Sequence, residues 1–121
     1  MNRLALAAAA AGVGLSVGWA VPAHAAGTWA AIAYSASSDY WHIAWGPATE
    51  SAAEQRAIQG CSDRGNDCQI VASSPNCVAL ADDGSSVHGG VGTTQQAAAN
   101  DALSRSGAGA HIEVAKCSTD P

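Results

Sequence analysis

The chain has 121 residues, with 10 acidic side chains against 5 Lys or Arg, and its formal net charge at neutral pH is −5. Binding to nucleic acids and to anionic membrane surfaces relies on clustered Lys and Arg, so this charge argues against both classes of partner. A chain of this length builds a small core, and the absence of Phe makes this core poorer still. We therefore expect covalent cross-links to help stabilise the fold.

The N-terminal segment predicts export. Arg3 precedes an uncharged apolar run over residues 4–21, and Ala23-His24-Ala25 places small residues where signal peptidase cuts. The alternative is a retained membrane anchor, because the run is just long enough to span a bilayer, but its many Ala and Gly residues favour cleavage. We expect residues 1–25 to be removed and residues 26–121, with a formal charge of −6, to form one secreted, extracellular domain without membrane insertion.

Two similar units follow each other along the expected mature chain, at about residues 28–74 and 76–117. The segment Trp29-Ala-Ala-Ile-Ala-Tyr-Ser35 matches Cys77-Val-Ala-Leu-Ala-Asp-Asp83, and His42-Ile-Ala-Trp-Gly46 matches His88-Gly-Gly-Val-Gly92 more loosely. Self-similarity of this kind indicates an internal repeat.

Each unit reads as strand, strand, helix, strand. The predicted strands lie at 29–35, 40–46, 68–73, 77–82, 86–91 and 110–116. A Ser-rich turn joins the first pair, and Asp83-Gly84 favours a hairpin in the second unit. Thr49 and Thr94 are predicted N-caps of Ala-rich helices, which we expect Gly65 and Gly107 to end. The pattern predicts a compact α+β domain of six strands and two helices with approximate two-fold symmetry.

All four cysteines lie in the expected mature chain, where an even number in a small domain indicates disulfides. Cys61 and Cys68 have no counterpart in the second unit, and Cys77 and Cys117 have none in the first. The repeat therefore predicts the pairs Cys61–Cys68 and Cys77–Cys117. The alternative is a zinc site that combines Cys61, Cys68 and two histidines, but six intervening residues match no common zinc motif. We expect no metal and no cofactor.

The candidate recognition residues are Tyr40, Trp41, His42, Trp45 and His88. Strand alternation places Trp41 and Trp45 on one face, and Tyr40 and His42 on the other. One interpretation makes the two Trp side chains part of the core, and the other makes the aromatic cluster a binding surface. His42 and His88 occupy matching positions, so a symmetry axis could bring them together as a metal or pH-sensing pair. Ordinary strand histidines are the simpler interpretation.

No motif predicts catalysis, and we assign no catalytic residue. The chain has Ser, His and Asp but no Gly-x-Ser-x-Gly, His-Glu-x-x-His, phosphate loop or dinucleotide fingerprint. His111 and Glu113 share one face of the last strand, which is typical of a solvated strand edge. The segment Asp82-Asp83-Gly84-Ser85 lacks the ligand spacing of a calcium loop and is interpreted as a turn.

The order of short motifs resembles a known family. Ala31-Ile-Ala-Tyr-Ser35, Trp45-Gly46, Cys68-Gln-Ile-Val71, Asn76-Cys-Val-Ala-Leu-Ala81 and the final Cys117 are similar to the bacterial domain-of-unknown-function family 4189. That family consists of small secreted proteins, largely from mycobacteria and other actinobacteria. The resemblance implies export, disulfides and a compact α/β module, and it supplies no catalytic mechanism.

Our leading hypothesis is a monomeric, non-enzymatic interaction module: an extracellular effector, an envelope-associated protein or an inhibitor that binds an extracellular or envelope protein. The alternative is a small extracellular hydrolase or ligand-binding protein that uses His42 or His88. A pocket that holds one of these histidines within hydrogen-bond reach of a Ser or Asp would favour the enzyme. A convex surface with an exposed Tyr40 or Trp would favour the interaction module.

Overall fold

The computed structural model describes residues 27–121, so the expected signal peptide, residues 1–25, lies outside the described residues. The elements in chain order are β1 (Ala30–Ser35), β2 (Tyr40–Trp45), α3 (Glu50–Cys61), β3 (Gln69–Ser74), β4 (Cys77–Asp82), β5 (Val87–Gly92), α4 (Gln95–Ser104) and β6 (His111–Cys117). Neither α3 nor α4, the helices of the described part, combines the length and apolar character that crossing a bilayer requires.

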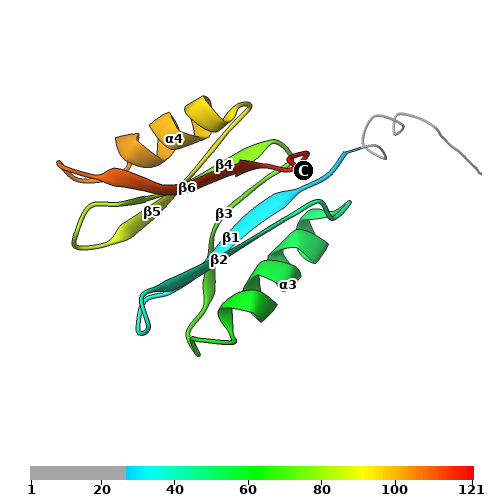
Figure 1. The fold of residues 1–121 in the computed structure, drawn as a ribbon, viewed down its shortest axis with the longest axis horizontal. Coiled ribbons are helices and arrows are strands. Elements are labelled where there is room, and N and C mark those ends of the chain that lie inside the picture. Colours follow the sequence, from blue (N-terminus) through cyan, green and yellow to red (C-terminus); the bar gives the residue numbers. More distant parts are fainter. Residues whose placement is uncertain (1–26) are drawn as a thin grey trace, which may run out of the picture.

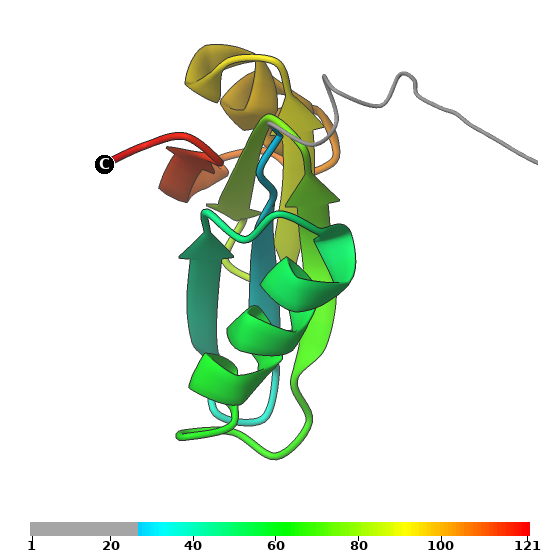
Figure 2. The same cartoon turned by 90° about the vertical axis from the view of Figure 1, so that its right-hand side faces the viewer.

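The strands form two antiparallel sheets of three, in the orders β2-β1-β3 and β5-β4-β6. The sheets pack face to face, with α3 on the outer face of the first sheet and α4 on the outer face of the second (Figures 1 and 2). The predicted α+β class with six strands and two helices is confirmed. Both units have the same order of elements, and in each the first strand is central.

Both predicted N-caps are confirmed. The hydroxyl Oγ1 of Thr49 accepts a hydrogen bond from the backbone N–H of Ala52 at 3.1 Å, and that of Thr94 accepts from Ala97 at 3.0 Å. These bonds satisfy backbone donors that the first turn of a helix leaves free. The helices therefore begin where the sequence places them.

The predicted helix ends are wrong by a few residues. The helices α3 and α4 end at Cys61 and Ser104, before Gly65 and Gly107. The two glycines instead make contacts between loops. A Cβ atom at Gly65 would lie 2.2 Å from Oγ of Ser35, and the N–H of Gly107 donates to Asp83 Oδ2 at 2.9 Å. At Gly65 the missing side chain permits the loop after α3 to approach the first hairpin, whereas at Gly107 the contact with the second hairpin is made by the backbone N–H.

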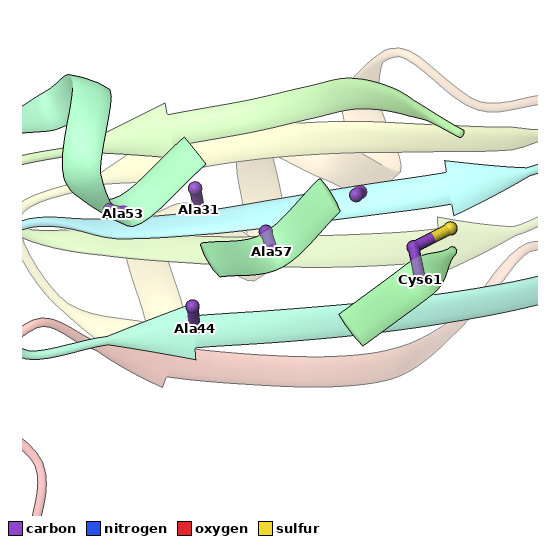
Figure 3. Close-up of a cluster of buried hydrophobic side chains, with 6 residues drawn as sticks. Ala31, Ala44, Ala53, Ala57 and Cys61 are labelled. Carbon is purple, nitrogen blue, oxygen red and sulfur yellow. The ribbon is translucent and has the colours of Figure 1, made fainter. Parts of the chain in front are cut away.

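Small side chains set the distance between each helix and its sheet. Ala53, Ala57 and Cys61 of α3 face Ala31 and Ala44 of the first sheet, and all five are buried (Figure 3). Methyl groups on both surfaces let the helix backbone pack tightly on the strands.

The second helix comes closer still to its sheet. A Cβ atom at Gly90 of β5 would lie 2.2 Å from the backbone nitrogen of Ala102 in α4. Any larger residue at this position would push α4 away from the sheet.

The core between the two sheets holds the largest buried side chains. Ile32, Val78 and Leu80 are fully buried there. Trp41 and Trp45 of β2 pack against them and are partly buried. The interpretation of these Trp side chains as part of the core therefore holds for the faces that contact the other sheet.

The sandwich is tighter along one edge than along the other. A Cβ atom at Gly89 of β5 would lie 2.1 Å from the carbonyl oxygen of Val71 in β3, so these two strands nearly touch. The position that matches Gly89 in the first unit is Ile43, which stands on β2 between Trp41 and Trp45. Bulky side chains of β2 therefore fill the space between the sheets along one edge. Along the other edge, Gly89 lets β3 and β5 approach each other closely.

Both disulfides have the predicted pairing, Cys61–Cys68 and Cys77–Cys117, and the described residues contain no free cysteine. The first ties the end of α3 to the loop before β3. The second joins residues directly opposite each other in the β4–β6 ladder. The zinc alternative for Cys61 and Cys68 is ruled out by this pairing.

Candidate recognition surface

The strand β2 presents an open edge. It pairs with β1 on one side and with no described strand on the other. Its sequence, Tyr-Trp-His-Ile-Ala-Trp, holds no Lys, Arg, Asp, Glu or Pro, as is also true of the edge strands β3 and β5, whereas the edge strand β6 carries Glu113 and Lys116. Proteins usually protect an open edge with charges or proline. The edge of β2 lacks that protection.

Trp45 is held by the C-terminal segment. Its indole Nε1–H donates to the carbonyl oxygen of Asp120 at 3.0 Å, and the Lys116 ammonium lies 4.6 Å from its ring centroid. Cation–π and hydrogen-bond contacts together fix this ring. Of the predicted recognition residues, Trp45 therefore has the clearest structural role.

Tyr40 and His42 lie on the α3 face of β2, opposite Trp41, as the alternation predicts. The guanidinium carbon of Arg64 lies 5.2 Å from the Tyr40 ring centroid. The His42 ring lies against Gly60 of α3, where a Cβ atom would come within 2.2 Å of the ring. Both side chains are partly buried and keep some surface open to solvent.

A shallow hollow of about 410 Å³ follows this edge, and Asp39, Tyr40, Trp41, His42 and Ile43 line it. Side chains of consecutive strand residues point to opposite faces of the sheet. Asp39 belongs to the β1–β2 turn, and the four consecutive β2 residues can line one hollow together only where it runs along the edge of the strand. The hollow therefore suits an occupant that lies beside β2.

The structure does not bring His88 near His42. His42 pairs with Ala33 and His88 with Ala81, and each of these alanines faces the helix on its own sheet. Both sheets therefore lie between the two histidines. The predicted surface divides into a β2 part and a separate His88 site.

His88 makes two polar contacts through one nitrogen. Its Nε2 lies 2.9 Å from Ser86 Oγ and 3.3 Å from Asp83 Oδ2. A Ser–His–Asp relay uses both ring nitrogens, one for the nucleophile and one for the acid, so this arrangement is not a relay. Hydrogen bonds from the backbone N–H groups of Gly107, Ser85 and Ser86 hold the pKa of Asp83 well below its usual range.

An enzyme of the expected kind needs a histidine that lines a hollow and also forms a hydrogen bond with a Ser or Asp. Neither His42 nor His88 does both. His42 lines the hollow along β2 but has no hydrogen bond to a Ser or Asp within residues 27–121. His88 has those hydrogen bonds but is not among the residues that line the neighbouring hollow of about 270 Å³. That hollow lies between the two hairpins and is lined by residues 34, 36, 39, 82 and 84–87.

Tyr34 stands in this second hollow. Its hydroxyl donates to Asp39 Oδ1 at 2.8 Å. Burial, this hydrogen bond and the charges of Asp39, Asp82 and Asp67 raise the pKa of Tyr34 to about 12. The phenol therefore stays protonated at neutral pH.

One cluster of metal-ligating residues was missed by sequence reasoning. Asp82 of β4 lies directly opposite His111 of β6, and Glu113 follows on the same strand. One ligand atom from each residue lies within 4.8 Å of the other two. The sequence pattern placed His111 and Glu113 on one strand face but assigned Asp82 to a turn. Only the pairing register of β4 with β6 brings Asp82 next to the other two residues.

The fold and its cross-links define a class of small, disulfide-linked α+β proteins made of two consecutive ββαβ units. The chain belongs to the family described as a domain of unknown function, DUF4189, whose model matches residues 29–118. The resemblance drawn from the sequence is confirmed.

The similar proteins are mycobacterial. "Protein Rv1269c" of Mycobacterium tuberculosis is 38% identical over 95 residues, which cover 78% of this chain and 73% of that protein. "Uncharacterized protein Rv1813c" of the same species is 40% identical over 78 residues, or 62% of this chain and 50% of that protein. The NMR structure of Rv1813c matches with a TM-score of 0.60 at 34% identity, over 74% of each chain.

Proposed function

We propose that the protein is exported and acts outside the cytoplasm as a non-enzymatic interaction module, which binds an extended segment of a partner protein along β2. The observation that carries this proposal is the hollow lined by Asp39 of the preceding turn and four consecutive residues of the open β2 edge. An extended peptide added to a sheet edge gains main-chain hydrogen bonds, and side-chain pockets on both faces give specificity.

The side chains along β2 suit this role. Tyr40 and Trp41 offer large rings on opposite faces of the strand, and Tyr and Trp are enriched among residues that dominate binding energy. The inner face of Trp41 is fixed by the inter-sheet core, and Tyr40 lies beside Arg64. Rings held in place lose little freedom when a partner binds, so they are effective anchors.

Export is supported by two independent features. Two disulfides are typical of oxidising compartments. The N-terminal sequence has the charge, apolar run and cleavage site of a signal peptide. Mass spectrometry of the culture medium of the native host should find the chain beginning at Ala26. Recovery of the uncleaved chain from the membrane fraction would contradict this.

The hydrolase alternative has one observation in its favour, the hydrogen bonds of His88 to Ser86 and Asp83. We favour the interaction module because both bonds fall on Nε2 and the second ring nitrogen is left without an acid to orient it. If the alternative were correct, Ser86→Ala would abolish a turnover that the unaltered protein displays.

Affinity capture with site variants tests the proposal. The oxidised protein, Tyr40→Ala and Trp41→Ala would be incubated with envelope and culture-medium proteins, after circular dichroism and thermal melting have shown that each variant is folded. Val91→Ala is the matched control, because it removes an exposed apolar side chain, 41% accessible, from an edge strand of the other sheet. A partner recovered by the unaltered protein and the control, and lost with both β2 variants, supports the proposal. Equal recovery by all four proteins would contradict it.

The same edge could pair with a second copy of the chain, since open edges are templates for strand addition. We propose a monomer, which light scattering should show up to millimolar concentration. A dimer that Tyr40→Ala dissociates would make β2 a self-association edge instead.

A further inference from the structure

The loops at one end of the sandwich concentrate negative charge. We call this end the turn end: it comprises the β1–β2, α3–β3, β4–β5 and α4–β6 connections and the strand residues next to them, and it lies away from the C-terminus in Figure 1. Six of the 10 acidic residues of the chain are here: Asp39, Asp63, Asp67, Asp82, Asp83 and Glu113. Arg64 and Arg105 are the basic residues of these connections, so the acidic side chains outnumber them and the turn end has a negative potential that attracts cations.

Within the turn end, three side chains converge from two strands. His111 and Asp82 are cross-strand partners in the β4–β6 ladder, and Glu113 lies two residues beyond His111, where the β4–β6 register shifts. The imidazole Nε2 of His111 lies 2.8 Å from Glu113 Oε2, and Asp82 completes a set whose ligand atoms lie within 4.8 Å of one another. Two carboxylates and an imidazole therefore point to one place.

The Asp82 carboxylate is oriented by its own turn. Its Oδ1 accepts the backbone N–H of Gly84 at 2.8 Å, which leaves Oδ2 for a further ligand. Hydrogen bonds of this kind hold metal-binding carboxylates in position in known sites. In contrast, the His111–Glu113 contact is largely exposed, with His111 65% and Glu113 31% accessible, and an exposed ion pair contributes little stability. A His111–Glu113 ion pair alone would not explain why the Asp82 carboxylate is held beside it.

We infer that Asp82, His111 and Glu113 form a binding site for a divalent transition-metal ion of the zinc type. One nitrogen and two carboxylate oxygens are a ligand set that Zn²⁺ accepts, with water in the open position. Ligand atoms of a tetrahedral zinc site lie roughly 3.4 Å apart, so the present separations need only small side-chain adjustments. Mg²⁺ and Ca²⁺ prefer six or more oxygen ligands, and this site offers too few.

Asp82 also lines the hollow between the two hairpins, so its carboxylate lies where that hollow meets the ligand cluster.

The test is calorimetric titration of the oxidised protein, free of any affinity tag, with ZnCl₂, MgCl₂ and CaCl₂. We expect one Zn²⁺ per chain and binding of Mg²⁺ and Ca²⁺ at least tenfold weaker. His111→Ala and Asp82→Asn should each weaken Zn²⁺ binding at least about tenfold. His88→Ala is the matched control, because it removes the other histidine that contacts an aspartate at the turn end, and it should change the affinity less than twofold.

A second measurement does not depend on variants. In the unaltered protein, amide NMR shifts on adding Zn²⁺ should be largest at residue 82 and at residues 111–113. The inference is overturned if Zn²⁺ does not bind at 1 mM, if His88→Ala weakens binding as much as His111→Ala does, or if the largest shifts lie elsewhere.

Discussion

Replacing Gly89 with Ala tests the close approach of the two sheets. A Cβ atom there would lie 2.1 Å from the carbonyl oxygen of Val71 and 3.0 Å from the Cβ atom of Ala72. Ordinary contacts are longer, so β3 and β5 must separate by roughly 1 Å, and part of the packing between the sheets is lost. The obstacle is backbone, which cannot rotate away as the end of a flexible side chain would.

The size of the effect follows from two opposing contributions. Overpacking a tight core costs about 1–3 kcal/mol, and replacing Gly by Ala in a strand recovers about 0.5–1 kcal/mol of conformational entropy. Because the clash involves backbone, we expect a net loss of about 2 kcal/mol, which lowers the melting temperature of a domain of this size by about 8–16 °C.

Thermal and denaturant unfolding of the oxidised protein measures this loss. The matched control is Val91→Ala on the same strand: Val91 is 41% accessible, so its truncation should change stability by less than about 0.5 kcal/mol. If Gly89→Ala is as stable as the unaltered protein, the described contact between β3 and β5 is incorrect.

Three further predictions concern cross-links and titrations. Replacing Cys77 and Cys117 by Ala opens a link between residues 40 apart and should cost about 4 kcal/mol in denaturant unfolding, whereas a loss below about 1 kcal/mol would contradict the chain-entropy reasoning. In Tyr40→Phe the remaining phenol, Tyr34, should titrate near pH 12 by absorbance at 295 nm, so the stability it contributes is complete below pH 10 and falls as pH rises toward 12; titration near 10 would refute this. The lowered pKa of Asp83 contributes stability above about pH 4 that is lost as pH falls further, so Asp83→Asn should flatten the acid side of a melting-temperature profile, and an unchanged profile would exclude this role.

The sequence predicted the local elements well because their signals are local. The N-cap threonines, the Asp83-Gly84 turn and strand alternation each act within a few residues, and all six strands and both helices lie where these signals place them. The disulfide pairing followed from comparing the two units. The helix ends were misplaced because Gly65 and Gly107 serve contacts with distant hairpins, which local rules do not include.

The candidate site was predicted less completely, because its properties depend on how the sheets face each other. Alternation placed Trp41 opposite Tyr40 correctly, but only the packed structure shows that Trp45 is held by the C-terminal segment. The separation of His42 from His88 likewise depends on which face of each sheet the helices cover. The convergence of Asp82 on His111 depends on strand register, which the sequence pattern left open.

Amide hydrogen exchange of the protein with and without its captured partner tests the central claim most directly. If the partner adds a strand to the open edge of β2, protection should increase over residues 40–45 and change little on β5, the corresponding edge of the other sheet. Protection that instead appears at the turn end or on α4, with residues 40–45 unchanged, would contradict the proposed recognition surface.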